Sequence, residues 1–278
     1  MNHPHLSSTA YQGDPVEFER KRPYPPEVVS AVVTALTAYL PEAATVADIG
    51  AGTGRWAIPL ARQGYRVLAL DLSSRMLNRL QANLLAWLAS FTAEQPHPLP
   101  RVVPILADAH ALPLPAGSCQ AVMTVHTLHL MQDLPRAVAE AVRVLQPGGR
   151  LFLGYMEHLP GSVVGWVMAT WRAMLREAGY DLNRPAWRDQ QDVLLVLRRF
   201  LEPEGKLTPA QWTPTVDPAQ VVEGALQRAY TLYWGLDDAT HRRFGERLLR
   251  QAQTVFAPFH QPRPDPRRFV WEVFQKPA

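Results

Sequence analysis

The stretch VADIGAGTGRWAIPLA, residues 46–61, most constrains what this chain can fold into. Glycines stand at positions 50, 52 and 54, between an apolar run and a second run with helical spacing. Glycine adopts positive φ and lets a ligand approach the backbone, and the N-terminus of a helix offers unpaired N–H groups. The stretch is therefore typical of a strand that turns into a helix at a nucleotide-binding site.

Short β-rich runs and helical runs alternate on both sides of this turn. We expect strands near residues 45–49, 66–70, 102–106, 121–125 and 150–155, and helices near 28–40, 55–63, 74–91 and 134–145. Apolar strands that alternate with helices favour a parallel sheet covered on both faces, and right-handed crossovers make it doubly wound. The pattern predicts an α/β fold with a doubly wound, mostly parallel sheet.

The alternation stops after Tyr155 and partly resumes later. We expect helices near 161–182 and 189–200, a strand near 206–216, a helix from Asp217 and Pro218 to about Trp234, a helix capped by Asp237 or Asp238, and a last strand at 267–275. We interpret the chain as one domain. Its parts are an N-terminal cap segment at 1–41, a core at 42–156, a helical insert or lid at 157–205, and strands and helices at 206–278 that complete the sheet.

Composition excludes several classes of protein. The net charge is +3 and the basic residues are scattered, so a nucleic-acid partner is not expected. The longest apolar runs are shorter than the roughly 18 residues that span a bilayer, and the N-terminus shows no secretory signal, so we expect a cytoplasmic protein without membrane insertion. The single cysteine, Cys119, and the lack of zinc-like spacing predict no disulfide and no metal site. Nothing in the sequence indicates an oligomeric state.

The spacing of the glycines separates two classes of ligand. The dinucleotide pattern G-x-G-x-x-G places its third glycine at position 55, which is Arg55 here. The observed pattern is D-x-G-x-G-x-G, beginning at Asp48. In this motif the chain resembles the class I S-adenosylmethionine-dependent methyltransferases. The resemblance implies a seven-stranded Rossmann-like sheet, S-adenosylmethionine as cofactor and S-adenosylhomocysteine as product.

The resemblance also implies which residues hold the cofactor. Its methionine and ribose parts would lie against the turn, and the acid at its start is tolerated beside a cationic sulfonium; the residues concerned are Asp48, Gly50, Ala51, Gly52 and Gly54. Asp71, about 20 residues further on, would accept both ribose hydroxyls, with Leu72 and Met76 beside it. As an alternative, Asp71 caps the helix that follows, a role that Ser73 suits equally well.

Two later stretches continue the resemblance. ILADAHALPLPAGSCQAVMTVHTLHLM contains an acid after the third strand and a His-bearing loop after the fourth, and RVLQPGGRLFLG turns into the fifth strand. By resemblance, Asp108 accepts from the adenine amino group, with the Ala109 N–H nearby. The motifs cover residues 46–154 in the family's order, and they are most similar to the small-molecule group that includes quinone-biosynthesis-like enzymes.

Candidates for further roles lie in the loop after the fourth strand and in the N-terminal segment. His126 and His129 are candidate general bases; alternatively, His126 contacts the cofactor through its backbone and His129 packs under the next helix, while His110 is a turn residue. Tyr11, Arg22 and Tyr24 resemble residues that close over the cofactor in related enzymes. A frayed polar terminus is the alternative for this segment.

The predicted function is methyl transfer to a small, apolar or aromatic acceptor. An aromatic and Met stripe supports an apolar pocket, although such a stripe is also typical of a core; its residues are Trp166, Met168, Trp171, Met174, Tyr230, Tyr233 and Trp234. Three alternatives stay open: nucleic-acid or protein methylation, for which an NPPY-like tetrad and a Pro–Cys pair are missing; a non-catalytic S-adenosylmethionine-binding regulator; and NAD-dependent oxidoreduction, which Arg55 disfavours.

Overall fold

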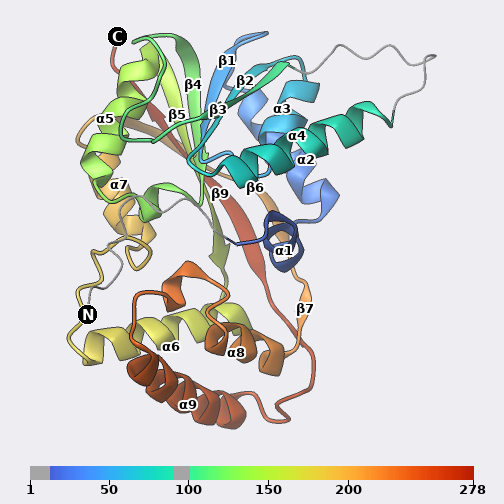
Figure 1. The fold of residues 1–278 in the computed structure, drawn as a ribbon, viewed down its shortest axis with the longest axis vertical. Coiled ribbons are helices and arrows are strands. Elements are labelled where there is room, and N and C mark those ends of the chain that lie inside the picture. The colour runs from blue at the N-terminus through green and yellow to red at the C-terminus, as the bar shows by residue number, and fades with distance from the viewer. Residues whose placement is uncertain (1–12, 91–100) are drawn as a thin grey trace. The chain divides into compact units, whose positions relative to one another are not determined.

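The computed structural model describes residues 13–90 and 101–278 (Figure 1). Tyr11 therefore lies outside the described residues. The chain divides into two compact units. Unit 1 contains residues 1–155, 193–210 and 270–278, and unit 2 contains residues 156–192 and 211–269.

The main sheet has seven strands, and its parallel part consists of the five strands β1 to β5, which carry the sequence motifs. Its order is β3-β2-β1-β4-β5-β9-β6. Asp48 on β1 pairs in register with Ala69 on β2 and with Met123 on β4. β9 and β6 form an antiparallel edge. The predicted doubly wound, mostly parallel sheet is therefore confirmed. The bounds are β1 Thr45–Ile49, β2 Arg66–Asp71, β3 Arg101–Leu106, β4 Cys119–Val125, β5 Leu145–His158, β6 Glu202–Trp212 and β9 Arg267–Gln275.

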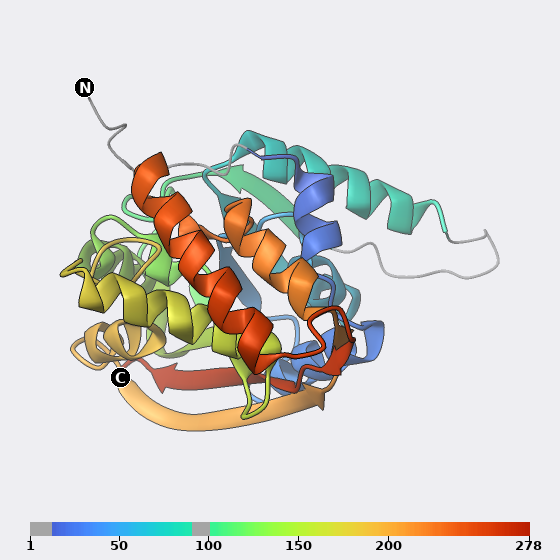
Figure 2. The same ribbon diagram turned by 90° about the horizontal axis from the view of Figure 1, so that it is seen from below.

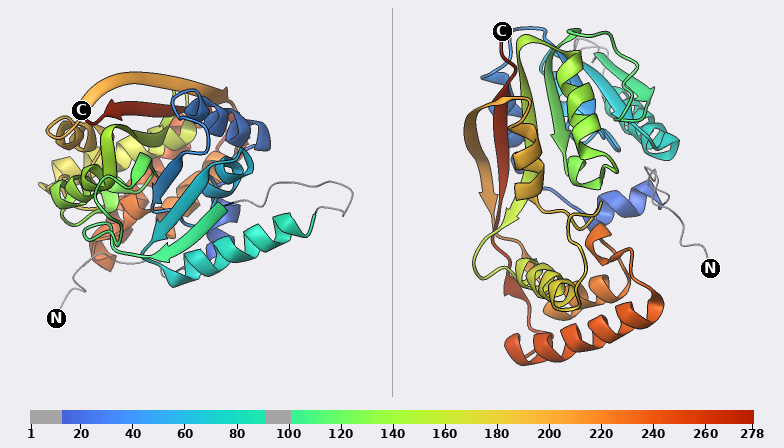
Figure 3. Two further views of the ribbon diagram at one scale, coloured as in Figure 1. Left: turned by 90° about the horizontal axis from the view of Figure 1, so that it is seen from above. Right: turned by 90° about the vertical axis from the view of Figure 1, so that its left-hand side faces the viewer.

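Helices cover both faces of this sheet. On one face lie α2 (Pro26–Thr37), α3 (Ala57–Arg62) and α4 (Ser74–Leu88), and on the other α5 (Leu134–Val144) and α7 (Gln190–Leu197) (Figures 1 and 3). The strands alternate accordingly. Trp271 of β9 donates from Nε1 to the Val32 carbonyl of α2 (3.0 Å), whereas Val270 and Phe274 pack in the cluster that contains the apolar faces of α5 and α7. Helix α1 (Pro15–Lys21) and the short 3-10 helix η1 (Leu128–Leu130) complete the elements of unit 1.

Unit 2 is a helical bundle with its own core. α6 (Val163–Glu177), α8 (Pro218–Leu226) and α9 (Asp238–Val255) lie side by side (Figure 2). A two-stranded sheet, β7 (Thr215–Val216) with β8 (Arg263–Pro264), and η2 (Thr231–Tyr233) accompany them. Trp171, Met174 and Tyr233 are at most 1% exposed and belong to this core, which supports the core interpretation for these three. The other members of the predicted stripe are half-buried: Trp166, Met168, Tyr230 and Trp234.

One predicted helix is too long. Asp217 caps α8 by accepting from the Ala219 N–H (2.8 Å), as expected, but the helix ends at Leu226 and does not reach Trp234. The reason is local: Arg228 adopts φ +54°, and the indole N–H of Trp234 donates back to the Arg228 carbonyl (2.8 Å). The predicted cap at Asp237 is confirmed, since its carboxylate accepts from the Thr240 N–H (2.9 Å).

Candidate functional site

The strand order brings the sequence motifs to one edge of the sheet. β3, β2, β1 and β4 are parallel neighbours, so their carboxyl ends lie at the same edge. Asp108 follows β3, Asp71 ends β2, the glycine turn follows β1 and His126 follows β4. In open α/β sheets, ligands bind outside the carboxyl ends of the strands where the order reverses, which here is between β1 and β4.

The glycine turn closes against β2 and against the loop after β4. The N–H groups of Gly50 and Ala51 both donate to the Leu70 carbonyl, at 2.8 and 3.0 Å. Gly50 has φ +77°, and a Cβ there would overlap the side chain of Thr127, so only glycine fits. Gly52 also has positive φ (+55°), but a Cβ there would meet open space. Gly52 is therefore the point where a ligand can approach the backbone.

Three further predicted positions, Ala51, Gly54 and Met76, are buried. Gly54 packs against Leu80 of α4 and Ile58 of α3, and Ala51 is buried. Met76 of α4 is only 3% exposed.

Asp71 connects β2 to the glycine turn. Its Oδ2 accepts from the Gly52 N–H and its Oδ1 from the Ser73 N–H, both at 2.8 Å. Ser73, not Asp71, caps α4, because its hydroxyl accepts from the Met76 N–H (3.4 Å). Burial raises the pKa of the Asp71 carboxyl, and the backbone N–H groups of Ser73, Gly52 and Leu72 offset part of that rise. A carboxylate offers about four acceptor positions, so this group retains capacity for ligand hydroxyls.

Asp48 lies beneath the turn. It is 1% exposed, and within the described residues its Oδ2 has no hydrogen-bond partner. Burial, together with the negative charge of Asp71, raises the pKa of Asp48 to about 8. The group is therefore protonated and uncharged at neutral pH.

Asp108 lies at the neighbouring strand end, where its side chain is 40% exposed. Burial acts to raise the pKa of this carboxyl, but hydrogen bonds from His110, together with the positive charge of the nearby Arg136, outweigh burial and hold the pKa below its usual range. Ala109 is buried beside it. Asp108 is thus an ionised, accessible acceptor.

His126 begins the loop after β4 and contacts the N-terminal segment. It has φ +54°, its N–H donates to the Gly154 carbonyl (3.2 Å), and its Nε2 lies 3.0 Å from the hydroxyl of Tyr24. The Tyr24 ring packs edge-on against Trp56, with centroids 5.2 Å apart, and the Arg55 guanidinium lies 5.0 Å from the centroid of the Tyr24 ring. His129 lies in η1.

The N-terminal segment is fixed by contacts that the sequence does not indicate. Glu19 of α1 accepts from Arg79 (2.9 Å) and from Asn83 (2.7 Å) of α4, and Asn83 also donates to the Thr53 carbonyl in the glycine turn (3.0 Å). Residues 13–24 are therefore anchored to α4 and the turn and are not frayed. Arg22 ends α1 and stacks on Phe18, 4.4 Å from its ring centroid.

Comparison with known proteins decides the family. A family model described as a methyltransferase domain matches residues 47–153. An uncharacterized methyltransferase of Mycobacterium bovis is 31% identical over 220 residues, which are 77% of this chain and 74% of the relative. The chain belongs to the class I S-adenosylmethionine-dependent methyltransferases. It is thus an enzyme of this class, as the glycine spacing predicted.

Two further comparisons refine this methyltransferase's relationships. The 27-O-demethylrifamycin SV methyltransferase of Amycolatopsis mediterranei is 32% identical over 167 residues, which are 50% of this chain and 58% of that relative. The crystal structure of the YcgJ protein from Bacillus subtilis superposes with a TM-score of 0.57 at 18% identity, covering 90% of this chain and 98% of that one, and so shares the fold.

Two other features, a metal-ion cluster and a membrane-spanning helix, were sought among the described residues. Within residues 13–90 and 101–278, no three His, Cys, Asp or Glu side chains gather as they would around a metal ion. In the same residues, no helix combines the length and apolar character of a membrane span.

Proposed function

We propose that this methyltransferase transfers a methyl group from S-adenosylmethionine to a small, apolar or aromatic acceptor. The observation that carries the proposal is the row of acceptor groups at the carboxyl edge of the parallel strands, in which Asp71 joins the glycine turn and Asp108 lies exposed one strand away. A nucleoside with a ribose and an exocyclic amine presents donors to both carboxylates.

The residues at this edge fit the cofactor. Asp71 would accept the ribose hydroxyls and Asp108 the adenine amino group, while open space at Gly52 admits the ligand against the backbone. Asp48 supports the turn from beneath. When bound, S-adenosylmethionine would supply a methyl group attached to a sulfonium. The leaving group would be the neutral thioether S-adenosylhomocysteine. The protein's main contribution is then to hold the acceptor in line, an effect worth up to roughly 7 to 11 kcal/mol.

For a hydroxyl acceptor, the proposal assigns the role of general base to the Tyr24–His126 pair. The Tyr24 hydroxyl is 3.0 Å from His126 Nε2, so it can pass its proton to that nitrogen while its oxygen takes the proton of the acceptor. His126 lies beside Thr127, whose side chain contacts Gly50 of the turn, so the pair is close to the cofactor's predicted position. The proposal assigns no role in proton transfer to His129.

Two observations support a small-molecule acceptor. The relative from Amycolatopsis mediterranei is named for methylation of 27-O-demethylrifamycin SV, a small molecule. The chain's basic residues are scattered, and the net charge of +3 is mild, which does not suit a nucleic-acid substrate.

The cofactor assignment is tested by calorimetry with S-adenosylhomocysteine and NAD. We expect the first to bind and the second not to bind. Asp71→Asn should weaken S-adenosylhomocysteine binding at least about tenfold, because it removes charge-assisted hydrogen bonds to the ribose. Asp237→Asn makes the same chemical change at a helix cap of unit 2 and should leave the affinity unchanged. NAD binding alone, or equal affinities for wild type and Asp71→Asn, would refute the assignment.

The base is tested by transfer of a labelled methyl group from S-adenosylmethionine to a panel of small phenols. We expect turnover by the wild type and a kcat about 100-fold to 10,000-fold lower for His126→Gln. Tyr24→Phe should also lower kcat, because it removes the hydroxyl that passes the proton to His126. An unchanged kcat in His126→Gln would exclude it as the base, and a protein that binds the cofactor but methylates no acceptor would favour the regulatory alternative.

A further inference from the structure

His110 bridges the adenine-side acid to the start of α5. Its Nδ1 lies 2.6 Å from Oδ1 of Asp108, and its Nε2 lies 3.2 Å from the backbone nitrogen of Asp133, the N-cap of α5. The side chain of His110 is only 11% exposed. These contacts differ from those of an ordinary turn residue, because the imidazole is held at both nitrogens.

The two contacts together define one tautomer of His110. A backbone N–H can only donate, so Nε2 must accept from Asp133 and carries no proton. The ring proton is then on Nδ1, and it donates to Asp108. The imidazole is neutral in this arrangement, and it is oriented by a main-chain group at one end and by a carboxylate at the other.

The bridge acts on one oxygen of Asp108. Oδ1 accepts from the His110 side chain and also from the His110 backbone N–H (2.9 Å). Among the described residues, Oδ2 of Asp108 accepts no hydrogen bond. The carboxylate is therefore held by one oxygen and presents the other, on a side chain that is 40% exposed.

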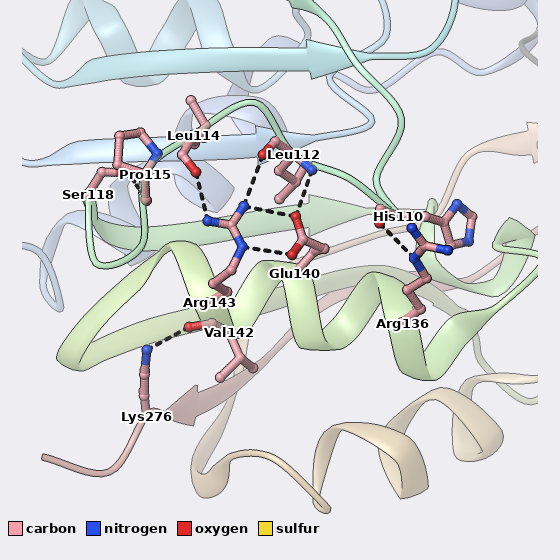
Figure 4. A network of polar contacts seen from close by, with 10 residues as sticks. All are labelled: His110, Leu112, Leu114, Pro115, Ser118, Arg136, Glu140, Val142, Arg143 and Lys276. Carbon is pink, nitrogen blue, oxygen red and sulfur yellow. Dashed lines mark hydrogen bonds and ion pairs between the residues drawn. The ribbon is translucent and has the colours of Figure 1, made fainter.

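Helix α5 holds the same loop at several points. Arg136 donates from Nε to the His110 carbonyl (3.0 Å), Glu140 accepts from the Leu112 N–H (2.8 Å), and Arg143 donates to the Leu112 and Leu114 carbonyls at 2.9 and 2.8 Å (Figure 4). The backbone around His110 is thus fixed independently of its ring. Removal of the ring should leave Oδ1 of Asp108 with only the His110 backbone N–H, and so loosen the carboxylate without releasing the loop.

We propose that His110 is a positioning residue, which turns Oδ2 of Asp108 toward the 6-amino group of the cofactor's purine and so selects a 6-amino over a 6-oxo purine. The inference rests on the proposed function, in which Asp108 accepts from adenine. A 6-oxo purine presents a carbonyl at this position, and two acceptors repel when no proton lies between them.

The test compares binding of S-adenosylhomocysteine and S-inosylhomocysteine, which differ in the 6-amino or 6-oxo group and in the N1 proton that accompanies the oxo group. For the wild type we expect a preference of at least about tenfold for the adenosyl compound, since a buried polar group left unpaired costs roughly that much or more. His110→Ala should reduce the preference to about threefold or less, mainly by weakening the adenosyl compound. His110→Asn should restore most of it, because the Asn amide nitrogen is placed like Nδ1 and can donate to Asp108.

Two further variants separate the possible failures. Asp108→Ala should abolish the preference, and adding His110→Ala to it should change nothing more, because both act through one contact. If Asp108→Ala keeps the full preference, the adenine assignment itself is wrong. If Asp108→Ala loses the preference and His110→Ala keeps it, or weakens both nucleosides equally, the positioning role is wrong. Circular dichroism and melting temperature confirm that each variant is folded.

Discussion

At the scale of single residues, Asp48 has an unusual position: it is an acid buried beneath the glycine turn. Its exposed fraction is 1%, and its pKa of about 8 lies above the ordinary 3.8 of an Asp carboxyl. Between these two pH values the folded chain holds a proton at Asp48 that the unfolded chain has lost. The free energy of unfolding contributed by this group therefore falls as pH rises, by about 1.4 kcal/mol per pH unit.

Asp48→Asn should remove this dependence. The amide has the same shape and cannot ionise, so we expect the variant and the wild type to unfold at similar urea concentrations at pH 4, and the variant to be the more stable at pH 7.5. Urea unfolding from pH 4 to pH 8 measures the effect. Glu140→Gln is the matched control, because Arg143 lowers the pKa of Glu140: the variant should be less stable than wild type by a constant amount above about pH 5, and this difference should shrink only at lower pH. If the stability of Asp48→Asn and of the wild type changed with pH in parallel, burial would not raise the pKa of the Asp48 carboxyl.

The residues that the sequence predicted best are those whose role depends on near neighbours in the chain. The spacing of the three glycines and the place of Asp71 at a strand end are local, and the structure joins them through the Gly52 N–H. The Tyr24–His126 contact joins positions 102 residues apart, and no local pattern indicates it. His110 is intermediate: Asp108 is two residues away, but the tautomer also depends on Asp133.

At the scale of elements, local signals predict where helices begin better than where they end. Side-chain caps at Asp217 and Asp237 are set by a residue and the next few N–H groups, and both were correct. The end of α8 depends on Arg228, which adopts positive φ although it is not glycine. Its carbonyl accepts from the indole of Trp234, six residues later, so a non-helical contact ends the helix although the helical spacing of the sequence continues.

Helix α1 shows that local sequence signals also fail to predict part of the candidate site. Its sequence is polar and would not be stable as an isolated helix of 7 residues. It is held by Glu19, which meets Arg79 and Asn83 of α4, 60 and 64 residues later. Because Asn83 also binds the Thr53 carbonyl, α1 is anchored to the glycine turn itself. This coupling places Tyr24 near His126, and periodicity alone does not reveal it.

At the scale of the whole molecule, the chain builds each of its two compact units from interleaved segments. The cluster around β1, β4, α5 and α7 consists of unit 1 residues, and the cluster around α6, α8 and α9 consists of unit 2 residues. The chain passes between the units inside elements, for example within β5 at residues 155–156 and within β9 at 269–270. The alternation of strands and helices predicted the core of unit 1. For unit 2 the sequence offered only the aromatic and Met stripe, which is typical of a core as well as of a pocket.

Because each unit has its own core, a cavity made in the core of one unit should destabilise that unit and leave the other unchanged. Trp171 is fully buried, and its ring lies 5.0 Å from that of Tyr233 and 5.7 Å from that of Phe244. Trp171→Ala should cost about 3 to 5 kcal/mol, as large-to-small changes in cores do. We expect hydrogen exchange to accelerate in peptides from residues 156–192 and 211–269, while β1, β2 and β4 keep wild-type protection. Leu153→Ala, in the core of unit 1, should give the opposite pattern. If either variant accelerates exchange equally throughout the chain, the two cores unfold as one cooperative unit.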